Sequence, residues 1–375
     1  MTAEASRALW AAPVPPSWDA LQALERVRAL AGCVQDPVHH AEGDVWIHTR
    51  MVLEVLVELP SWQALDPVGR HVTWLACLWH DVGKPATTRI EPDGRVSARG
   101  HSRVGERIVR RMGYELGVPF ALREAVCGLI RYHQIPFFAI DAEDPVRVAC
   151  EVTQVCRADW LAVVAEADLR GRICADTQRI LDAIALFREL CAEQGCLDRP
   201  RPFPDDHTRI AYLRSTGRSP DVPVHDDRRG TLVMTCGLPG AGKDTWLARC
   251  HPGIAVVSLD QLRAELRIAP TDDQGAVVQA GRERLREHFR RGEPVAFCAT
   301  NLDRRRRAET VDLAWDYGYR VEIGYVEVPD GVRIAQNRGR DAVVPEAVVS
   351  RMKDRWDLPT PLEAHRVRWI TSDAA

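Results

Sequence analysis

The chain has 375 residues, of which 46% are hydrophobic, and its formal net charge at pH 7 is −3. This length predicts two or three domains, each able to bury a core without a disulfide framework. The near-neutral charge excludes a protein coated in basic residues, so a nucleic-acid partner would require a local basic groove. The 11 cysteines include no CxxC pair, which indicates buried thiols in a reducing compartment and not a zinc ribbon.

The N-terminus lacks the long apolar core of a signal peptide, and no stretch approaches the ~20 apolar residues of a membrane span. We therefore expect a cytoplasmic protein without a membrane partner. Residues 1–18, rich in Ala and Pro, are predicted as a loose leader, and residues 19–198 show helical periodicity with almost no strand pattern. Pro and Asp interrupt the pattern in residues 199–229, which are predicted as a linker. Residues 230–375 alternate short β-branched runs with helical stretches. The sequence thus predicts a multidomain fold, with an all-α helical bundle followed by an α/β domain with a parallel sheet.

Several apolar helix faces in the helical half carry a His or an Asp. His133 and Asp168 lie seven residues after Val126 and Leu161, on the apolar faces of their predicted helices. His48 is the first residue of another apolar helix face, and His80 and Asp81 follow the last residue of a third. A lone histidine on such a face is most often a hydrogen-bonded core residue, whereas burying a lone carboxylate is costly. Taken together, the residues are explained by a divalent transition-metal site to which several helices contribute neutral imidazoles and carboxylates.

Five strings carry a family resemblance in this half. They are HisAlaGluGlyAspValTrpIleHisThr (40–49), HisAspValGlyLys (80–84), GlyHisSerArgValGlyGlu (100–106), ArgTyrHisGln (131–134) and AlaAspLeuArgGlyArg (167–172). In this order they resemble the HD phosphohydrolase superfamily, and they look most like the HD domains found beside tRNA nucleotidyltransferases and polynucleotide kinases. The resemblance covers about residues 38–172.

The resemblance implies a metal site, with Mn²⁺ as the expected ion and Co²⁺ or Ni²⁺ as alternatives. A first metal would be held by His48, His80, Asp81 and Asp168, while His101 and His133 would hold a second metal or contact the phosphate. Lys84 and Arg172 would bind the phosphate oxygens. Bound metal makes hydroxide available near neutral pH, and the cations stabilise the charged phosphoryl group. The alternative is a degenerate HD fold without activity.

A glycine-rich loop opens the second half. Residues 231–250 read as a strand, the loop GlyLeuProGlyAlaGlyLysAspThr and a helix start, which is the context that a P-loop needs. Backbone N–H groups at the helix N-terminus would face the phosphates of ATP or GTP, and Lys243 would bridge the β- and γ-phosphates. Asp244 stands where a Ser or Thr usually follows the lysine, so Thr245 is expected to contact Mg²⁺. The predicted nucleotide-binding residues are Gly237, Pro239, Gly240, Ala241, Gly242, Lys243, Asp244 and Thr245.

The next strand is followed by Asp260 and, one helical turn later, Arg263. Ligands sit beyond the carboxyl ends of parallel strands, so Asp260 is expected near the γ-phosphate, where it can accept the proton of an attacking hydroxyl. The alternative role for Asp260 is the N-cap of the following helix. Arg304–Arg307 begin a later helix, where they oppose its dipole, and they are either a solvated charge run or part of a binding groove.

The strings GlyLeuProGlyAlaGlyLys, SerLeuAspGlnLeuArg, AlaThrAsn and AsnArgGlyArg through ValPro resemble the 5′-OH polynucleotide kinase family over about residues 230–365. The resemblance implies that Asp260 is the general base on the 5′-hydroxyl and that Arg263 contacts a phosphate of the acceptor strand. It further implies lid arginines on ATP: Arg340, together with Arg333 and Arg338.

The order of the two halves resembles the bacterial HD-Pnk end-healing enzymes. The implied function is removal of a 2′,3′-cyclic or 2′/3′ phosphate from one nucleic-acid end and ATP-dependent phosphorylation of the 5′-OH at the other. The implied partners are RNA or DNA ends, ATP, and a ligase acting downstream. Two alternatives stay open. One is an HD nucleotide phosphohydrolase fused to a small-molecule kinase, and the other is an ATP-regulated RNA-binding module with a structural HD site.

Overall fold

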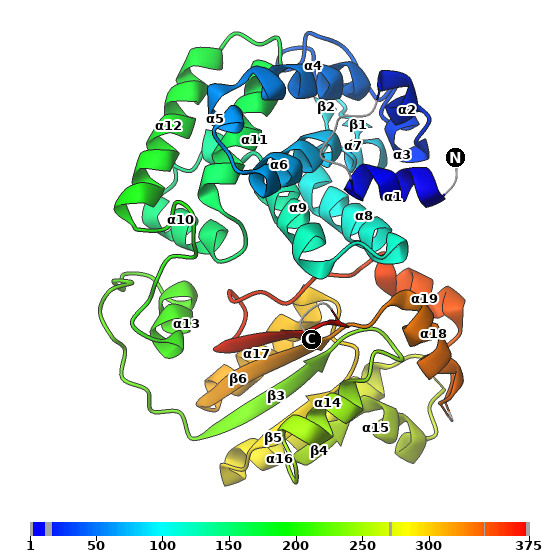
Figure 1. The fold of residues 1–375 in the computed structure, drawn as a ribbon. Helices are drawn as coiled ribbons and strands as arrows, with labels where there is room; N and C mark the ends of the chain where they lie inside the picture. Colours follow the sequence, from blue (N-terminus) through cyan, green and yellow to red (C-terminus); the bar gives the residue numbers. More distant parts are fainter. Residues whose placement is uncertain (1–2, 12–16, 270–271, 341, 373–375) are drawn as a thin grey trace. The chain divides into compact units, whose positions relative to one another are not determined.

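The computed structural model describes residues 3–11, 17–269, 272–340 and 342–372. The chain divides into two compact units, residues 1–202 and residues 203–375. The first unit is helical apart from one short hairpin, and the second contains a five-stranded parallel sheet, which confirms the predicted order of an all-α part and an α/β part (Figure 1). Within the described ranges, no helix is long and apolar enough to cross a membrane.

The first unit is built from short and medium-length helices (Figure 1). Its elements are α1 (Ala3–Ala11), α2 (Trp18–Gln22), α3 (Glu25–Arg28), α4 (Val45–Glu58), α5 (Pro60–Gln63), α6 (Pro67–Trp79), α7 (Lys84–Thr87), β1 (Arg89–Ile90), β2 (Val96–Ser97), α8 (His101–Leu116), α9 (Phe120–Tyr132), the 3₁₀ helix η1 (Ile135–Phe137), α10 (Pro145–Thr153), α11 (Ala158–Arg170) and α12 (Thr177–Glu193).

Helix α11 lies at the centre of this unit and packs against α4, α6, α9 and α12. Its residues from Leu161 to Ala165 are almost completely buried, as expected of a helix that is apolar on most of its circumference. The partner helices have sharp starts, because Asp44 caps α4 through the N–H of Ile47 and Asp66 caps α6 through the N–H of Gly69. These caps fix where α4 and α6 begin.

The second unit is an α/β domain. Its elements are α13 (Asp206–Arg214), β3 (Gly230–Cys236), α14 (Lys243–Cys250), β4 (Ala255–Ser258), α15 (Leu259–Leu266), α16 (Gly275–Arg291), β5 (Val295–Cys298), α17 (Arg304–Asp316), β6 (Tyr319–Val326), α18 (Asp330–Arg338), α19 (Glu346–Lys353) and β7 (Arg366–Ile370). The strand order is β4-β5-β3-β6-β7, and every pairing in this sheet is parallel.

Strand β3 is the central strand of the sheet. Leu232 pairs with Val295 of β5 on one side and with Val321 of β6 on the other. Helix α14 packs against β3 and β6, while α16 packs against β4 and β5 (Figure 1). The chain moves to one side of β3 for β4 and β5 and to the other side for β6 and β7, so the loop after β3 lies where a parallel sheet binds ligands.

Three boundaries differ from the sequence-based prediction. In the predicted leader, residues 3–11 form helix α1, whose Leu9 and Trp10 are buried; residues 1–2 and 12–16 lie outside the described ranges. In the predicted linker, residues 206–214 form α13, which belongs to the second unit because His207 stacks on Trp315 and His365. Strand β7 was missed, because an edge strand with an alternating basic pattern lacks the apolar run of a buried parallel strand.

Candidate metal centre and nucleotide cleft

The six predicted metal ligands come together inside the first unit. Each lies on or at the end of a helix: His48 on α4, His80 and Asp81 after α6, His101 at the start of α8, His133 after α9, and Asp168 on α11. All six are at most 7% exposed.

Three of these residues surround one point. The Nε2 atom of His48 lies 3.2 Å from Nε2 of His80 and 3.1 Å from Oδ1 of Asp168. The Nε2 atom of His80 is 3.8 Å from the same Asp168 oxygen. One donor atom from each residue lies within 4.8 Å of the other two, which is close enough for a single metal ion to bind all three.

A second group adjoins the first. Asp81, His101 and His133 also place their donor atoms within 4.8 Å of one another. Nε2 of His101 lies 3.4 Å from Oδ1 of Asp81 and 3.4 Å from Nε2 of His133. The other oxygen of Asp81, Oδ2, lies 3.2 Å from Nε2 of His80, so the Asp81 carboxylate lies between the two groups.

The hydrogen bonds of the four histidines decide which ring nitrogen carries the proton. The Nδ1 atoms of His80, His101 and His133 lie 2.7 to 2.9 Å from backbone carbonyl oxygens, and that of His48 lies 3.2 Å from the carbonyl of Gly171. A carbonyl can only accept, so each Nδ1 donates, and in the neutral ring the Nε2 atom then presents a lone pair. Four such lone pairs converge on two carboxylates. Among the described residues, no donor forms a hydrogen bond to buried Oδ1 of Asp81. This donor set fits divalent transition metals.

The charge states of the aspartates and of His133 also suit a metal site. Burial opposes ionisation of both aspartates, but His80 and Lys84 hold the pKa of Asp81 well below its usual range. Arg172 and His48 do the same for the pKa of Asp168. Burial lowers the pKa of His133 to about 3, with His80 and His101 adding to the effect, so this imidazole is neutral and able to bind a metal.

Lys84 and Arg172, the predicted phosphate-binding cations, each contact one metal-ligand carboxylate. Nζ of Lys84 is 2.7 Å from Oδ2 of Asp81 and donates to Gln35 Oε1 at 2.6 Å. Arg172 holds Asp168 through both oxygens, at 2.5 and 3.0 Å, and its guanidinium lies over the ring of Phe137. Both cations therefore balance the charge of the ligand set.

In the second unit, the loop between β3 and α14 has the backbone of a phosphate-binding loop. Gly237, Gly240 and Gly242 all have positive φ. A Cβ on Gly237 would lie 2.3 Å from the carbonyl oxygen of Val326, and one on Gly240 would lie 2.5 Å from that of Arg333. Only glycine fits these two positions. Lys243 begins α14, and its Nζ donates to the carbonyls of Gly237 and Leu238 at 3.1 and 2.9 Å.

Asp260, Arg263 and Arg340 are in contact beside this loop. Asp260 lies in the first turn of α15, whose N-cap is Ser258, so Asp260 is not the N-cap that was its alternative role. Its Oδ1 accepts from Nη1 of Arg263, and its Oδ2 lies 3.2 Å from Nη2 of Arg340, which follows α18. Arg263 also donates through Nε to Gln274 at 2.7 Å.

The two units match different family models. Residues 45–163 match the HD domain, and residues 232–359 match an AAA domain. The match to the HD model ends before Asp168.

Curated relatives include the CC-adding tRNA nucleotidyltransferase of Thermus thermophilus, which is 38% identical over 111 residues, 29% of this chain and 24% of the relative. The multifunctional CCA protein of Methylococcus capsulatus is 35% identical over 107 residues, 28% of this chain and 23% of that protein. The chain thus spans about a quarter of the length of these relatives. Among solved structures, a gluconokinase from Sinorhizobium meliloti aligns with a TM-score of 0.29 and 19% identity, covering 38% of this chain and 83% of that one.

The first unit therefore contains an HD domain, and the second contains an AAA domain with a phosphate-binding loop.

One large cleft of the second unit contains most of the predicted nucleotide-binding residues. It is lined by residues 239–245 of the loop and by Asp260, Arg263 and Arg340. Its other lining residues include Asn301 and the basic residues Arg306, Arg351 and Arg355. The cleft encloses about 3110 Å³, several times the 300–1,000 Å³ of ordinary small-molecule pockets.

Not every predicted arginine of the second unit faces this cleft. Arg307 is fully buried and holds Glu363 at 2.7 Å, so the predicted groove residues Arg304–Arg307 do not act as one surface. Arg333 is buried between Asp330 and Glu346 and is a structural residue of α18. Arg338 is exposed and lies outside the residues that line the cleft. Of the three predicted lid arginines, Arg340 alone lines the cleft.

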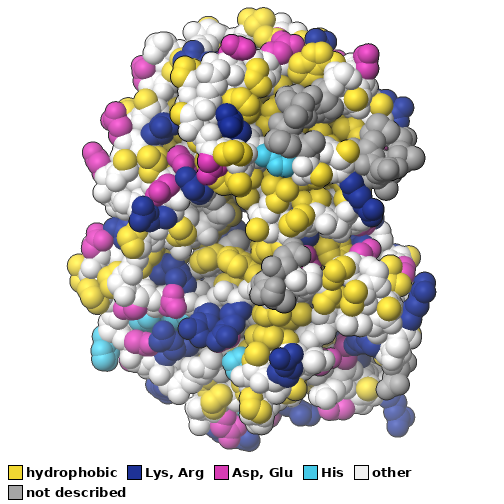
Figure 2. Space-filling view, viewed as in Figure 1, with side chains coloured by type: hydrophobic (Ala, Val, Ile, Leu, Met, Phe, Trp, Pro, Cys, Tyr) yellow, Lys and Arg dark blue, Asp and Glu magenta, His cyan; other side chains and the backbone are white. Residues whose placement is uncertain are grey.

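Basic residues do not cover the whole of the visible surface (Figure 2), in agreement with the near-neutral net charge. Figure 2 shows acidic, basic and apolar side chains mixed on one face, with Lys and Arg gathered over the part of the second unit that carries β6 and β7.

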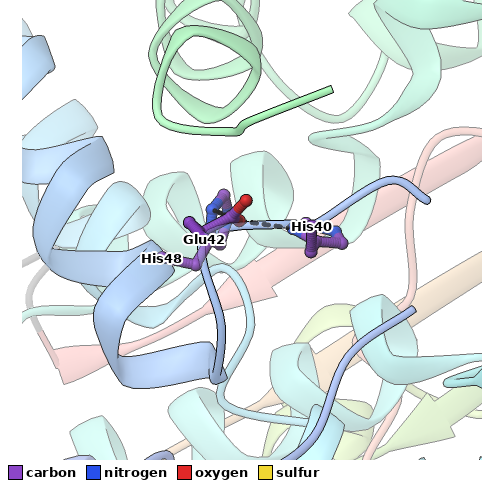
Figure 3. A group of neighbouring side chains, drawn as sticks. All are labelled: His40, Glu42 and His48. Atoms are coloured by element: carbon purple, nitrogen blue, oxygen red, sulfur yellow. Dashed lines mark hydrogen bonds and ion pairs between the residues drawn. The ribbon is translucent and has the colours of Figure 1, made fainter. Parts of the chain in front are cut away.

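Sequence reasoning missed two residues of the HD domain. His40 and Glu42 lie before α4, and they form a third group of possible ligand atoms with His48 (Figure 3). Both belong to the first string that carried the family resemblance, but neither lies on an apolar helix face, so periodicity gave no signal for them.

Proposed function

We propose that this protein heals nucleic-acid ends with two active sites. The HD domain removes a 2′,3′-cyclic or 2′/3′ phosphate, and the kinase-like domain transfers the γ-phosphoryl group of ATP to a 5′-hydroxyl. The observation that carries the proposal is the pairing, in one chain, of a buried His/Asp donor set with a carboxylate, Asp260, beside a phosphate-binding loop. The HD site would hydrolyse a phosphoester, and the site beside the phosphate-binding loop would phosphorylate a hydroxyl.

In the kinase-like domain, Asp260 acts as general base. The 5′-oxygen forms a bond to the γ-phosphorus, the bond to the β,γ-bridging oxygen breaks, ADP leaves, and the hydroxyl proton passes to the Asp260 carboxylate. Backbone N–H groups of the loop and Lys243 hold the triphosphate, while Arg340 neutralises its charge. Before ATP binds, Asp260 is held by both arginines, and Arg263 keeps its carboxylate oriented once Arg340 binds the triphosphate.

In the HD domain, His48, His80, Asp81 and Asp168 would hold one divalent metal, and His101 and His133, with Asp81, a second. A bound metal supplies a water-derived hydroxide near neutral pH and withdraws charge from the phosphoryl group. Lys84 and Arg172 hold Asp81 and Asp168 in their ionised form and place positive charge next to the phosphate.

The polynucleotide acceptor is supported by the size and lining of the cleft. A nucleotide is small compared with about 3110 Å³, and Arg263, Arg306, Arg351 and Arg355 are among the residues that line the cleft. Guanidinium groups bind phosphate in bidentate geometry, so a cleft of this lining suits a strand that carries several phosphates.

The test is an assay of both ends of one substrate: an oligonucleotide with a 5′-OH and a 2′,3′-cyclic phosphate, incubated with ATP and Mn²⁺ or Mg²⁺. We expect a 5′-phosphate and loss of the cyclic phosphate. Phosphorylation of free nucleosides or sugars in place of the oligonucleotide would refute the polynucleotide acceptor. A metal-loaded HD domain that hydrolyses neither the cyclic phosphate nor a generic phosphodiester would refute the phosphoesterase.

A further inference from the structure

Glu42 is a buried carboxylate that contacts a metal-ligand histidine from behind (Figure 3). Its side chain is 1% exposed, and its Oε1 lies 3.0 Å from Nδ1 of His48 and 2.8 Å from Nδ1 of His40. Its Oε2 accepts from the backbone N–H of Ile173 at 2.9 Å. Burying a carboxylate in the HD domain is costly, but the hydrogen bonds from His40 and Ile173 and the close approach of the His48 ring offset the cost, so the segment before α4 holds an oriented charge.

His48 differs from the other converging histidines in what faces its Nδ1. His80, His101 and His133 donate to backbone carbonyls, whereas Nδ1 of His48 faces both the carbonyl of Gly171 and the carboxylate of Glu42. Both partners of His48 are acceptors, so its Nδ1 carries the proton and its Nε2 lone pair points toward His80 and Asp168. An ionised acceptor behind the ring also makes that lone pair more basic.

We infer that Glu42 is a positioning residue of the metal centre: it fixes the Nδ1–H tautomer and ring orientation of His48 and strengthens His48 as a ligand. The inference rests on the proposed metal site of the HD domain. Glu42 lies behind the ring, on the side away from Nε2, so it acts through His48.

A metal held by His40, Glu42 and His48 themselves is the competing explanation, because their ligand atoms also lie within 4.8 Å of one another. The position of Gly171 argues against it. Its carbonyl oxygen lies 3.2 Å from Nδ1 of His48 and needs a proton there, whereas a metal at Nδ1 would remove that proton. His48 would then also have to bind two ions through both ring nitrogens.

The experiment titrates the metal-free full-length protein with Co²⁺, whose visible absorption reports its ligands. We compare wild type with Glu42→Gln, Glu42→Ala and Glu42→Asp. The matched control is Asp44→Asn, because Asp44 lies on the same segment and its side chain accepts from two backbone N–H groups, those of Ile47 and Gly32, and not from the ring of His48. Asp81→Asn serves as the variant that removes a ligand.

We expect Glu42→Gln and Glu42→Ala to weaken Co²⁺ binding by about 10–100-fold and to shift the absorption of the bound ion, as is typical when an outer partner of a ligand is lost. Glu42→Asp should recover part of the affinity, and Asp44→Asn should bind Co²⁺ as wild type does. The thermal unfolding of each metal-free variant shows whether it is folded. If Glu42→Ala does not fold, the isosteric Glu42→Gln decides.

Two outcomes overturn the inference and leave the proposed function standing. One is wild-type affinity and spectrum in both Glu42→Gln and Glu42→Ala while Asp81→Asn loses the metal, and the other is an equal loss in Asp44→Asn. Loss of one of several bound Co²⁺ ions, with the spectrum of the others unchanged, would also overturn it in favour of a metal at His40 and Glu42. A wild-type protein that binds neither Co²⁺ nor Mn²⁺ would refute the proposed function of the HD domain and the inference with it.

Discussion

Nη2 of Arg340 lies 3.2 Å from Oδ2 of Asp260, although the two residues are 80 positions apart in the chain. Asp260 lies in the first turn of α15 and Arg340 follows α18, so this contact joins the segment after β4 to the segment expected to close over the triphosphate. When ATP binds, Arg340 can exchange the carboxylate for a phosphate oxygen and leave Asp260 free to accept a proton. The contact between Arg340 and Asp260 therefore belongs to the site before ATP binds.

Replacing Asp260 with Asn should remove the general base and keep the shape of the side chain. We expect the kcat for phosphoryl transfer to a 5′-OH oligonucleotide to fall by about 10²–10⁴-fold, with little change in the KM for ATP. Transfer of labelled γ-phosphate measures this, and hydrolysis of the cyclic phosphate by the same sample should be unchanged. A variant that keeps more than a tenth of the activity would show that another group takes the proton.

Arg340→Ala should lower the kcat of the kinase by about 10²-fold or more. The variant lacks the guanidinium group that stabilises the negative charge of the phosphoryl group in the transition state. Arg340→Lys should recover only part of this, since an ammonium group lacks the planar, bidentate geometry. Steady-state kinetics with varied ATP separate kcat from KM. Arg291→Ala, which removes an exposed arginine at the end of α16, is the control for loss of surface charge. Equal effects in the two alanine variants would contradict a specific role of Arg340.

Asp81→Asn should abolish the phosphoesterase and spare the kinase. Asp81 contributes an oxygen to each of the two ligand groups, so its loss should lower metal content and activity by more than the 10–100-fold typical of an outer partner. Metal analysis of the purified protein and the cyclic-phosphate assay measure the two effects. Parallel loss of the kinase activity would contradict two separate active sites.

Gly83→Ala should disturb the metal centre by steric means. A Cβ at this position would lie 2.1 Å from the carbonyl oxygen of His101, so the start of α8 must move and carry His101 with it. We expect a loss of about 1–3 kcal/mol in the free energy of unfolding, together with weaker metal binding. Gly105→Ala is the control, because the nearest atom to its Cβ would be a side-chain methyl of Ile130 at 3.3 Å. Thermal unfolding and Co²⁺ titration measure both variants, and equal effects would show that His101 is not specifically displaced.

A buried histidine makes the kinase-like domain sensitive to acid. Nδ1 of His365 accepts from the N–H of Val321 at 3.0 Å, and burial lowers its pKa from 6.5 to about 3, with Arg320 adding to the effect. Between these two pH values the unfolded chain binds a proton that the folded chain does not, so stability is complete above pH 6.5 and falls as the pH is lowered toward 3. The slope should be about 1 kcal/mol per pH unit, near the limit for one group.

His365→Asn tests this directly. Its side-chain oxygen can replace Nδ1 as the acceptor for Val321, but it cannot be protonated in this range. Urea unfolding of the full chain above and below pH 6.5 should show a shallower loss of stability in the variant than in wild type. The same slope in both proteins would show that other groups cause the acid sensitivity.

The sequence predicted the parts of this protein that depend on periodicity and motif, and it failed where a role depends on distant partners. Strands β3 to β6 and the helical half follow from apolar patterns, and the ligand histidines lie on or at the ends of helices in that half. The run Arg304–Arg307 could not be resolved in this way, because only the fold shows that Arg307 turns inward to Glu363. Glu42 likewise gains its role from His48 and Ile173, residues that lie up to 131 positions away.

Helix α13 illustrates a different limit. Its sequence contains a capping signal, Asp205 followed by Thr208, but the helix is short and is preceded by prolines. Its place in the second unit depends on the stacking of His207 on Trp315 and His365, a contact between segments about 100 to 160 residues apart. Local pattern cannot reveal such a contact, so the segment was predicted as a linker.

The buried guanidinium of Arg307 has a consequence for shortened forms of the chain. It donates to Glu363 and to the carbonyls of Asn301 and Asp357, and Asn301 has an unusual positive φ of 46° beside the cleft. A protein that ends before Glu363 would still contain all of the kinase-like motifs, yet it would leave this cation buried without its carboxylate, a defect that typically costs about 3–5 kcal/mol. We therefore expect the smallest piece of the second unit that folds to extend past Glu363, beyond the last motif residue, Pro345.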